Sequence, residues 1–123
     1  MSIFGIIVFT REVIGVKVFV YGSLLTGLGN HGVVKQFINK KKRGTVNGKL
    51  YSLGAFPALK EGDDEVHGEL YYIDEDNQEI ALDKLDYLEG HPFLYTRKKT
   101  EVETKDGTEK AWTYFYNGDI SDK

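Results

Sequence analysis

Short apolar runs, some continuous and some alternating with polar residues, predict a chain made mostly of β-strands. Gly, Pro, Asn or Asp bound these runs, and such residues favour turns over strands. The expected strands are residues 16–20, 45–53, 66–73, 94–104 and 109–117, with a turn or bulge at 54–57 and a hairpin turn at 106–107. The first run is apolar at almost every position, which is typical of a strand buried on both faces.

Two segments have the apolar spacing of a helix. From Gln78 to Glu89 the spacing places one apolar face along a helix that Gly90 ends, and Asp76 and Glu79 are spaced like a capping box. Residues 33–39 predict a second, shorter helix. The order is therefore strand, short helix, two strands, helix, two strands. This order favours an α+β fold over a doubly wound parallel sheet.

Glu89 is the acid of the longer helix that a helical wheel directs inward. It lies roughly 40° from the middle of the face formed by residues 81, 82, 85 and 88, whereas Asp83 and Asp86 point away. Burial and the negative end of the helix dipole both disfavour its anion, so we expect a raised pKa. Such a carboxyl group suits general acid–base catalysis. The alternative is a frayed last turn with Glu89 in water.

Two glycine-containing segments could bind an anion. The turn Tyr21-Gly22-Ser23-Leu24 leaves a strand, and its backbone N–H groups could hold a carboxylate or a phosphate. Residues 27–32 match Gly-x-Gly-x-x-Gly, the pattern of dinucleotide-binding proteins. We reject that interpretation because residues 21–26 separate the motif from the strand and no acid occurs between Gly32 and Lys60.

The composition narrows the classes of function. The 123 residues suit a single domain, and a net charge of −3 argues against a nucleic-acid-binding surface. The basic run 40–43 is interpreted as a solvated turn at the end of the shorter helix. The chain lacks cysteine, which excludes disulfides and thiolate chemistry and agrees with a cytoplasmic protein. The three histidines fit no zinc pattern.

Residues 3–9 form an apolar run close to the N-terminus. No lysine or arginine precedes it, so a strand is favoured over a signal peptide. The run is far shorter than the ~20 apolar residues of a membrane span. An exposed strand of this kind promotes association, so we expect the fold or a second copy of the chain to cover it.

Seven segments together resemble the γ-glutamylcyclotransferase-like proteins, especially the small bacterial and archaeal members and the γ-glutamylamine cyclotransferases. Each segment is weak alone, but they occur in the family's order between about residues 16 and 117, and residues 1–15 lie outside the resemblance. The segments are Val20-Tyr21-Gly22-Ser23-Leu24, Gly29-Asn30-His31, residues 48–59, Val66-His67-Gly68-Glu69-Leu70-Tyr71, Leu85-Asp86-Tyr87-Leu88-Glu89-Gly90, Tyr95-Thr96-Arg97 and residues 111–116.

The resemblance implies a small mixed β-barrel flanked by helices, and conversion of a γ-glutamyl amine or amino acid into 5-oxoproline. It implies that Glu89 carries the proton, that the turn formed by Tyr21, Gly22, Ser23 and Leu24 holds the γ-glutamyl group, and that Tyr95 lies near the pocket. Tyr116 is a weaker candidate. Neither a metal nor an organic cofactor is expected. One alternative is a binding module of the same fold without turnover. The others are an enzyme for a γ-glutamylated antibiotic precursor or isopeptide-derived amine, and a protein that associates through residues 3–9.

Overall fold

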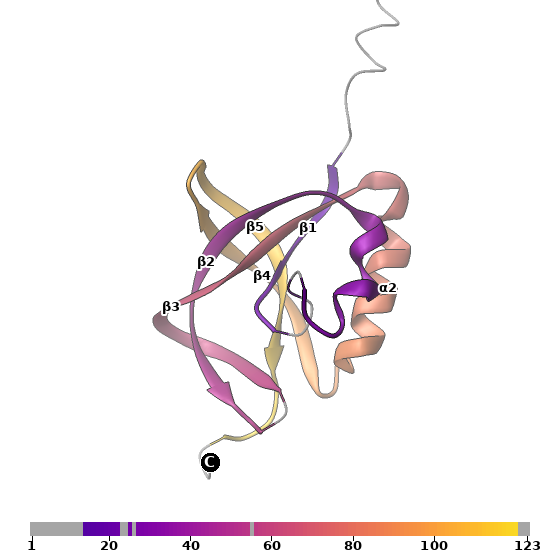
Figure 1. The fold of residues 1–123 in the computed structure, drawn as a ribbon. Helices are drawn as coiled ribbons and strands as arrows, with labels where there is room; N and C mark the ends of the chain where they lie inside the picture. The colour runs from indigo at the N-terminus through magenta and orange to yellow at the C-terminus, as the bar shows by residue number, and fades with distance from the viewer. Residues whose placement is uncertain (1–13, 23–24, 26, 55, 121–123) are drawn as a thin grey trace, which may run out of the picture.

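Five strands dominate the computed structural model, which describes residues 14–22, 25, 27–54 and 56–120 (Figure 1). The elements are β1 Ile14–Val20, η1 His31–Val33, η2 Lys35–Phe37, β2 Ile38–Ser52, β3 Pro57–Asp74, η3 Glu75–Asn77, α2 Gln78–Glu89, β4 Tyr95–Thr104 and β5 Gly107–Tyr116, where η marks a 3₁₀ turn. Within these residues α2 is the only α-helix. The α+β class predicted from the sequence is confirmed.

The strands follow one another around a barrel in the order β1-β3-β2-β4-β5. All neighbours are antiparallel except β1 and β5, which are parallel. Long ladders join β2 to β3 and β4 to β5. The β2/β4 seam has one paired position, Thr45 with Glu103, and the β1/β5 seam has one, Val18 with Trp112. The barrel is therefore held loosely at these two seams.

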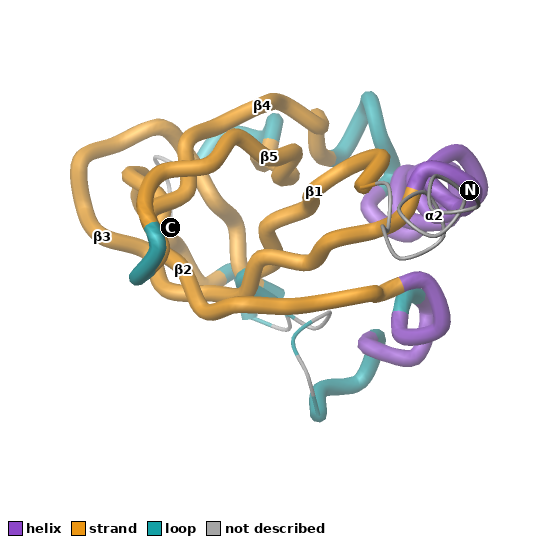
Figure 2. The backbone as a smooth tube through the Cα atoms, turned by 90° about the horizontal axis from the view of Figure 1, so that it is seen from above, coloured by secondary structure: helices purple, strands orange, loops and turns teal. Residues whose placement is uncertain are grey.

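The continuous apolar run of β1 separates two hydrophobic cores. Val18 and Val20 point into a core shared with Ala81 and Leu85 of α2, whereas Phe19 points into the interior of the barrel. Successive side chains of a strand alternate between its faces, so one strand serves both cores. In Figure 2 the strands curl around a common interior, and α2 lies with the short 3₁₀ turns at one side.

The prediction of a short helix at 33–39 is wrong. The segment forms two separate 3₁₀ turns, and Ile38 already begins β2. Val34 and Phe37 are both buried, and a spacing of three residues suits a 3₁₀ turn as well as an α-helix. The ladder between β2 and β3 reaches Ile38, which pairs with Ile73. This long-range pairing makes the residues from Ile38 onward a strand, so the predicted helix cannot extend over them.

The interpretation of the basic run 40–43 is wrong for the same reason, because these residues lie within β2 and follow no helix. Two of them make specific contacts on one face of the strand. The Lys42 ammonium lies 3.0 Å from the Glu109 carboxylate, and the Lys40 ammonium lies 4.9 Å from the centre of the Tyr72 ring.

The start of α2 also differs from the prediction. Asp76 and Glu79 form no capping box. Instead the carboxylate of Asp74 accepts a hydrogen bond from the backbone N–H of Asn77 at 3.1 Å, and this caps η3 one turn earlier. The strand expected at 66–73 begins at Pro57. Its first half includes four exposed, charged residues, Glu61, Asp63, Asp64 and Glu65. It also includes a bulge, where the register moves from Gly48–Asp64 to Lys49–Lys60.

Candidate active site

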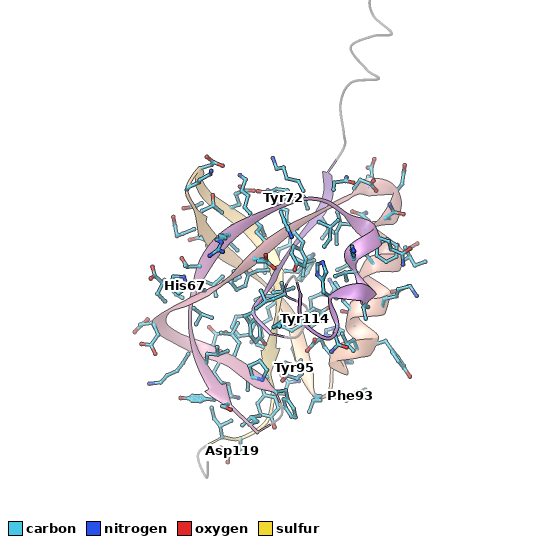
Figure 3. All side chains as sticks on the ribbon, in the orientation of Figure 1. His67, Tyr72, Phe93, Tyr95, Tyr114 and Asp119 are labelled. Atoms are coloured by element: carbon cyan, nitrogen blue, oxygen red, sulfur yellow. The ribbon has the colours of Figure 1, made fainter. Side chains whose placement is uncertain are left out.

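A cavity of about 60 Å³ lies where the last turn of α2 meets the end of β1 and the start of β3. Strands β4 and β5 each contribute one tyrosine to it. Figure 3 labels these two side chains, Tyr114 near the middle of the molecule and Tyr95 below it. The residues that line the cavity are Phe19, Val20, Tyr21, Gly22, Phe56, Pro57, Glu89, Tyr95 and Tyr114.

Glu89 is the one charged side chain among these lining residues. It is the last residue of α2, and Gly90 follows in the left-handed region with a φ of 66°. The N–H of Gly90 donates to the Tyr87 carbonyl at 3.2 Å, and the N–H of His91 donates to the Asp86 carbonyl at 2.9 Å. These two bonds form a Schellman motif, which ends the helix directly after Glu89 and fixes its side chain on the buried side.

Burial raises the pKa of Glu89 from its ordinary value of 4.5 to about 7. A carboxylate loses hydration when the protein surrounds it, so the neutral acid is favoured relative to the anion. Near pH 7 both protonation states are therefore populated. A carboxyl group in this condition can accept a proton and return it without a large energetic cost for either step.

Burial, together with the negative charge of Glu89, raises the pKa of three tyrosines that line the cavity, Tyr21, Tyr95 and Tyr114. Burial and then the negative charge of Glu89 raise the pKa of Tyr95 to about 12. Burial, followed by the neighbouring Tyr95 and Glu89, raises the pKa of Tyr21. The Tyr95 hydroxyl donates to the Pro57 carbonyl at 2.7 Å, and the Tyr21 hydroxyl donates to the Tyr114 carbonyl at 2.5 Å. Both side chains therefore stay neutral near pH 7 and are held to other strands.

Asp86, which the helical wheel directs away from the apolar face of α2, is half-buried. Its carboxylate accepts a hydrogen bond from Tyr114 at 2.6 Å and two from the Arg97 guanidinium at 2.8 and 3.1 Å. Burial alone would raise the pKa of Asp86, but the hydrogen bonds from Arg97 and Tyr114 outweigh it and lower the pKa below 3.8. This network ties α2, one turn before Glu89, to β4 and β5.

The fold brings Tyr21, Gly22, Glu89 and Tyr95 together in the lining of one cavity. Gly22 is needed there for space, since a Cβ would lie 2.9 Å from the Pro57 ring. The predicted residues Ser23 and Leu24 lie outside the described residues. Tyr116 does not line the cavity, but its ring packs edge-on against Tyr95 with centroids 5.4 Å apart.

Sequence reasoning assigned no site role to the five other residues that line the cavity. Phe19 and Val20 precede the predicted turn, and Phe56 and Pro57 lie in a segment of the family resemblance that implies no role for them. Tyr114 also lies within a quoted motif. Tyr114 lies beside β1 only because of the order of the strands in the barrel. The alternation of apolar and polar residues along β5 does not show that Tyr114 lines the cavity.

No cluster of three or more His, Asp or Glu side chains that could hold a metal ion occurs in the described part of the chain. Within the same residues, no helix is both long enough and apolar enough to cross a bilayer.

Residues 18–123 match the model of the family described as "Gamma-glutamyl cyclotransferase, AIG2-like". The chain belongs to this family. A relative from Vibrio cholerae, named "Putative gamma-glutamylcyclotransferase", is 42% identical over 105 residues, which is 80% of each chain. A relative with the same description from Methanocaldococcus jannaschii is 37% identical over 103 residues, or 80% of this chain and 82% of its own.

One relative has a named substrate. The γ-L-glutamyl-butirosin B γ-glutamyl cyclotransferase of Niallia circulans is 31% identical over 110 residues, covering 84% of this chain and 68% of its own. Among solved structures, a mouse AIG2-like protein has a TM-score of 0.72 at 24% identity, covering 90% of this chain and 82% of its own. At that identity the likeness concerns the fold alone.

Proposed function

We propose that this protein is a γ-glutamylcyclotransferase that converts a γ-glutamyl amine or γ-glutamyl amino acid into 5-oxoproline and the free amine. The observation that carries the proposal is the carboxyl group of Glu89, which lines a small cavity and has a pKa of about 7. Family membership supports the reaction class. A functional carboxyl group needs both access to a ligand and a pKa near the working pH, and Glu89 has both.

In the proposed reaction, the α-amine of the substrate attacks its own γ-carbonyl carbon. The amine begins as an ammonium group, so the Glu89 carboxylate first removes a proton. The new C–N bond gives a tetrahedral intermediate, and the bond to the leaving nitrogen then breaks. That nitrogen receives the proton from Glu89, which regenerates the carboxylate. The attacking nitrogen must also lose a second proton as the lactam forms, and the released amine takes it up and leaves as an ammonium ion, so protons and charge balance.

Most of the remaining catalysis comes from holding a curled substrate. The reaction is intramolecular, so its rate depends on how often the amine and the carbonyl meet in the correct orientation. Tyr21, Gly22 and Tyr95 line the walls on which the γ-glutamyl group would rest. Ser23 and Leu24 complete the proposed binding turn, whose N–H groups would hold the substrate carboxylate or the developing oxyanion.

The direct test measures 5-oxoproline release from a panel of γ-glutamyl dipeptides and γ-glutamyl amines. Active wild-type protein and inactive Glu89→Gln are expected, because Gln has a similar shape but cannot carry the proton. The matched control is Asp83→Asn, which removes an exposed carboxylate of the same helix. Turnover by Glu89→Gln would refute the assigned role.

A binding module without turnover is the alternative that this panel also tests. Calorimetry with the same compounds would then detect binding without 5-oxoproline release. A γ-glutamylated antibiotic precursor should be included in the panel, because one relative is named for its action on γ-L-glutamyl-butirosin B. A cytoplasmic location is a further part of the proposal, and cell fractionation would test it.

A further inference from the structure

The cavity encloses only part of any γ-glutamyl substrate. A site needs about 10–15 Å³ of such volume to hold one water molecule, so about 60 Å³ accommodates only a few water-sized groups. This is enough for the polar end of a γ-glutamyl group but not for the amine that leaves. The leaving group must therefore lie against the residues at the mouth of the cavity.

One large apolar side chain of the cavity lining is exposed to solvent, and two more belong to the turn that directly follows Glu89. Phe56 lines the cavity and is 43% exposed, while Phe93 and Leu94 are 87% and 47% exposed. Exposed apolar side chains are common singly, but one in the cavity lining and two in the turn next to Glu89 together favour an apolar ligand. Figure 3 shows Phe93 at the same end of the molecule as Tyr95.

Backbone hydrogen bonds hold these side chains close to Glu89. The Gly90 carbonyl accepts from the N–H groups of Phe93 and Leu94 at 2.9 and 2.8 Å, which makes the chain turn tightly directly after Glu89. The following residue, Tyr95, donates its hydroxyl to the Pro57 carbonyl at 2.7 Å. The turn that carries Phe93 is thus joined to the segment that carries Phe56.

The charges at the cavity disfavour an acidic leaving group. None of the described lining residues is a lysine or an arginine, and Glu89 is the charged group present. A leaving amino acid would bring a second carboxylate toward Glu89 with no cation on this wall to offset it. The Lys60 ammonium lies 5.6 Å from the centre of the Tyr116 ring, and neither residue lines the cavity.

We propose that Phe56, Phe93 and Leu94 form the leaving-group subsite, and that the substrates are γ-glutamyl amides of apolar primary amines. This inference rests on the proposed function and restricts it. The apolar part of the amine would cover side chains that are otherwise wet, and that burial favours the complex in proportion to the apolar area removed from water.

Three matched substrates test the two parts of the inference. γ-Glutamyl-phenethylamide carries an apolar ring, γ-glutamyl-ethylamide lacks the ring, and γ-glutamyl-phenylalanine adds a carboxylate to the first compound. We expect kcat/KM for the phenethylamide to exceed each of the others at least tenfold. Equal values for the phenethylamide and the ethylamide would overturn the apolar subsite. A preference for γ-glutamyl-phenylalanine that Lys60→Ala removes would show an acidic leaving group instead.

Variants at the mouth should reduce the advantage of the ring. Phe93→Ser is expected to lower the ratio of kcat/KM for phenethylamide over ethylamide several-fold, as is Phe56→Ser. The side chain of Phe93 is almost fully exposed, so this variant should keep its fold. The control is Tyr87→Ser, which removes a 91% exposed aromatic ring from α2 outside the cavity lining. An unchanged ratio in both mouth variants would contradict the subsite.

The failure of this inference and that of the proposed function are distinguishable. Calorimetry with Glu89→Gln compares binding of the phenethylamide and the ethylamide when turnover is absent. Tighter binding of the phenethylamide, with no 5-oxoproline from the wild type, would keep the subsite and reject the enzyme. Turnover of all three substrates at equal kcat/KM would keep the enzyme and reject the subsite.

Discussion

Glu89 changes its charge in a pH range where Asp86, one turn earlier on the same helix, stays ionised. Its ordinary pKa of 4.5 rises to about 7 because it is buried, while hydrogen bonds from Arg97 and Tyr114 hold that of Asp86 below 3.8. Two acids one turn apart on the same helix therefore differ in charge below pH 7. This difference gives each acid a separate signature in pH-dependent measurements.

The raised pKa of Glu89 predicts that Glu89→Gln stabilises the protein at alkaline pH. The folded state binds the proton more tightly than the unfolded chain, so ionisation costs stability as pH rises through about 7. At 1.36 kcal/mol for each unit of pKa, the rise from 4.5 corresponds to about 3 kcal/mol at pH 8. Below pH 4.5 the acid is neutral in both states, so the difference should vanish.

Urea denaturation of the two proteins at pH 4 and pH 8 measures this effect. Equal stability of wild type and variant at both pH values would show that Glu89 is solvated. A lower stability of Glu89→Gln at both values would instead indicate a structural hydrogen bond from this carboxyl group.

The pH dependence of turnover provides a second prediction at the same residue. The proposed base must be ionised in the free enzyme, so kcat/KM should rise as pH increases from 5 and level off above about 7. Initial rates of 5-oxoproline release across this range measure the midpoint. A midpoint near 4.5 would mean that the functional carboxyl group is not the buried one.

At the scale of the element, α2 is fixed at its C-terminal end by both the backbone and its side chains. The Schellman motif ends the helix, and Asp86 joins it to Arg97 and Tyr114. The extent of the helix and the inward position of Glu89 follow from apolar spacing and Gly90, so the sequence predicts them. The partners of Asp86 belong to β4 and β5, and only the tertiary fold brings them near.

Asp86→Asn is expected to lower the free energy of unfolding by about 1–3 kcal/mol, because it removes charge-assisted hydrogen bonds to Arg97 and Tyr114. The folded pKa of Asp86 is lowered, so its contribution is present above pH 3.8 and is lost as pH falls below that value. The penalty should therefore shrink at pH 2–3.

Thermal unfolding at pH 7 and at pH 2.5 measures the penalty of Asp86→Asn. Asp83→Asn is the matched control on the same helix, and a change within about 0.5 kcal/mol is expected there because Asp83 is exposed. A penalty for Asp86→Asn that stayed constant with pH would indicate lost packing and not lost charge.

At the scale of the molecule, the sequence predicts the elements better than their arrangement. The α+β class, α2 and the hairpin of β4 and β5 are local in origin, and each is present. β2 extends to Ile38 and β3 extends back to Pro57 because the two strands pair with each other. The added segments are rich in polar residues and lack the alternation of apolar and polar positions that predicts a strand. The same limit explains why Tyr114 was missed at the cavity.

The β1/β5 seam predicts a measurable weak point of the barrel. Its one ladder pair is supported by the fully buried Thr113 hydroxyl, which donates to the Phe19 carbonyl at 2.9 Å. Thr113→Val should cost about 1 kcal/mol, the net value of a typical hydrogen bond. Chemical denaturation measures this cost, and Thr100→Val of β4 is the control. Equal losses in both variants would deny a special role to the seam.

The β1/β5 seam can form only late in synthesis, because its two strands lie near opposite ends of the chain. Phe19 meets Thr113 and Tyr21 meets Tyr114, so one wall of the cavity joins residues more than 90 positions apart. On a ribosome that adds roughly 5–20 residues per second, β1 is synthesised several seconds before its partner strand. During that interval its apolar side chains lack one of their two neighbours. The nascent chain is therefore most prone to aggregation before β5 emerges, and the ligand site is among the last features to form.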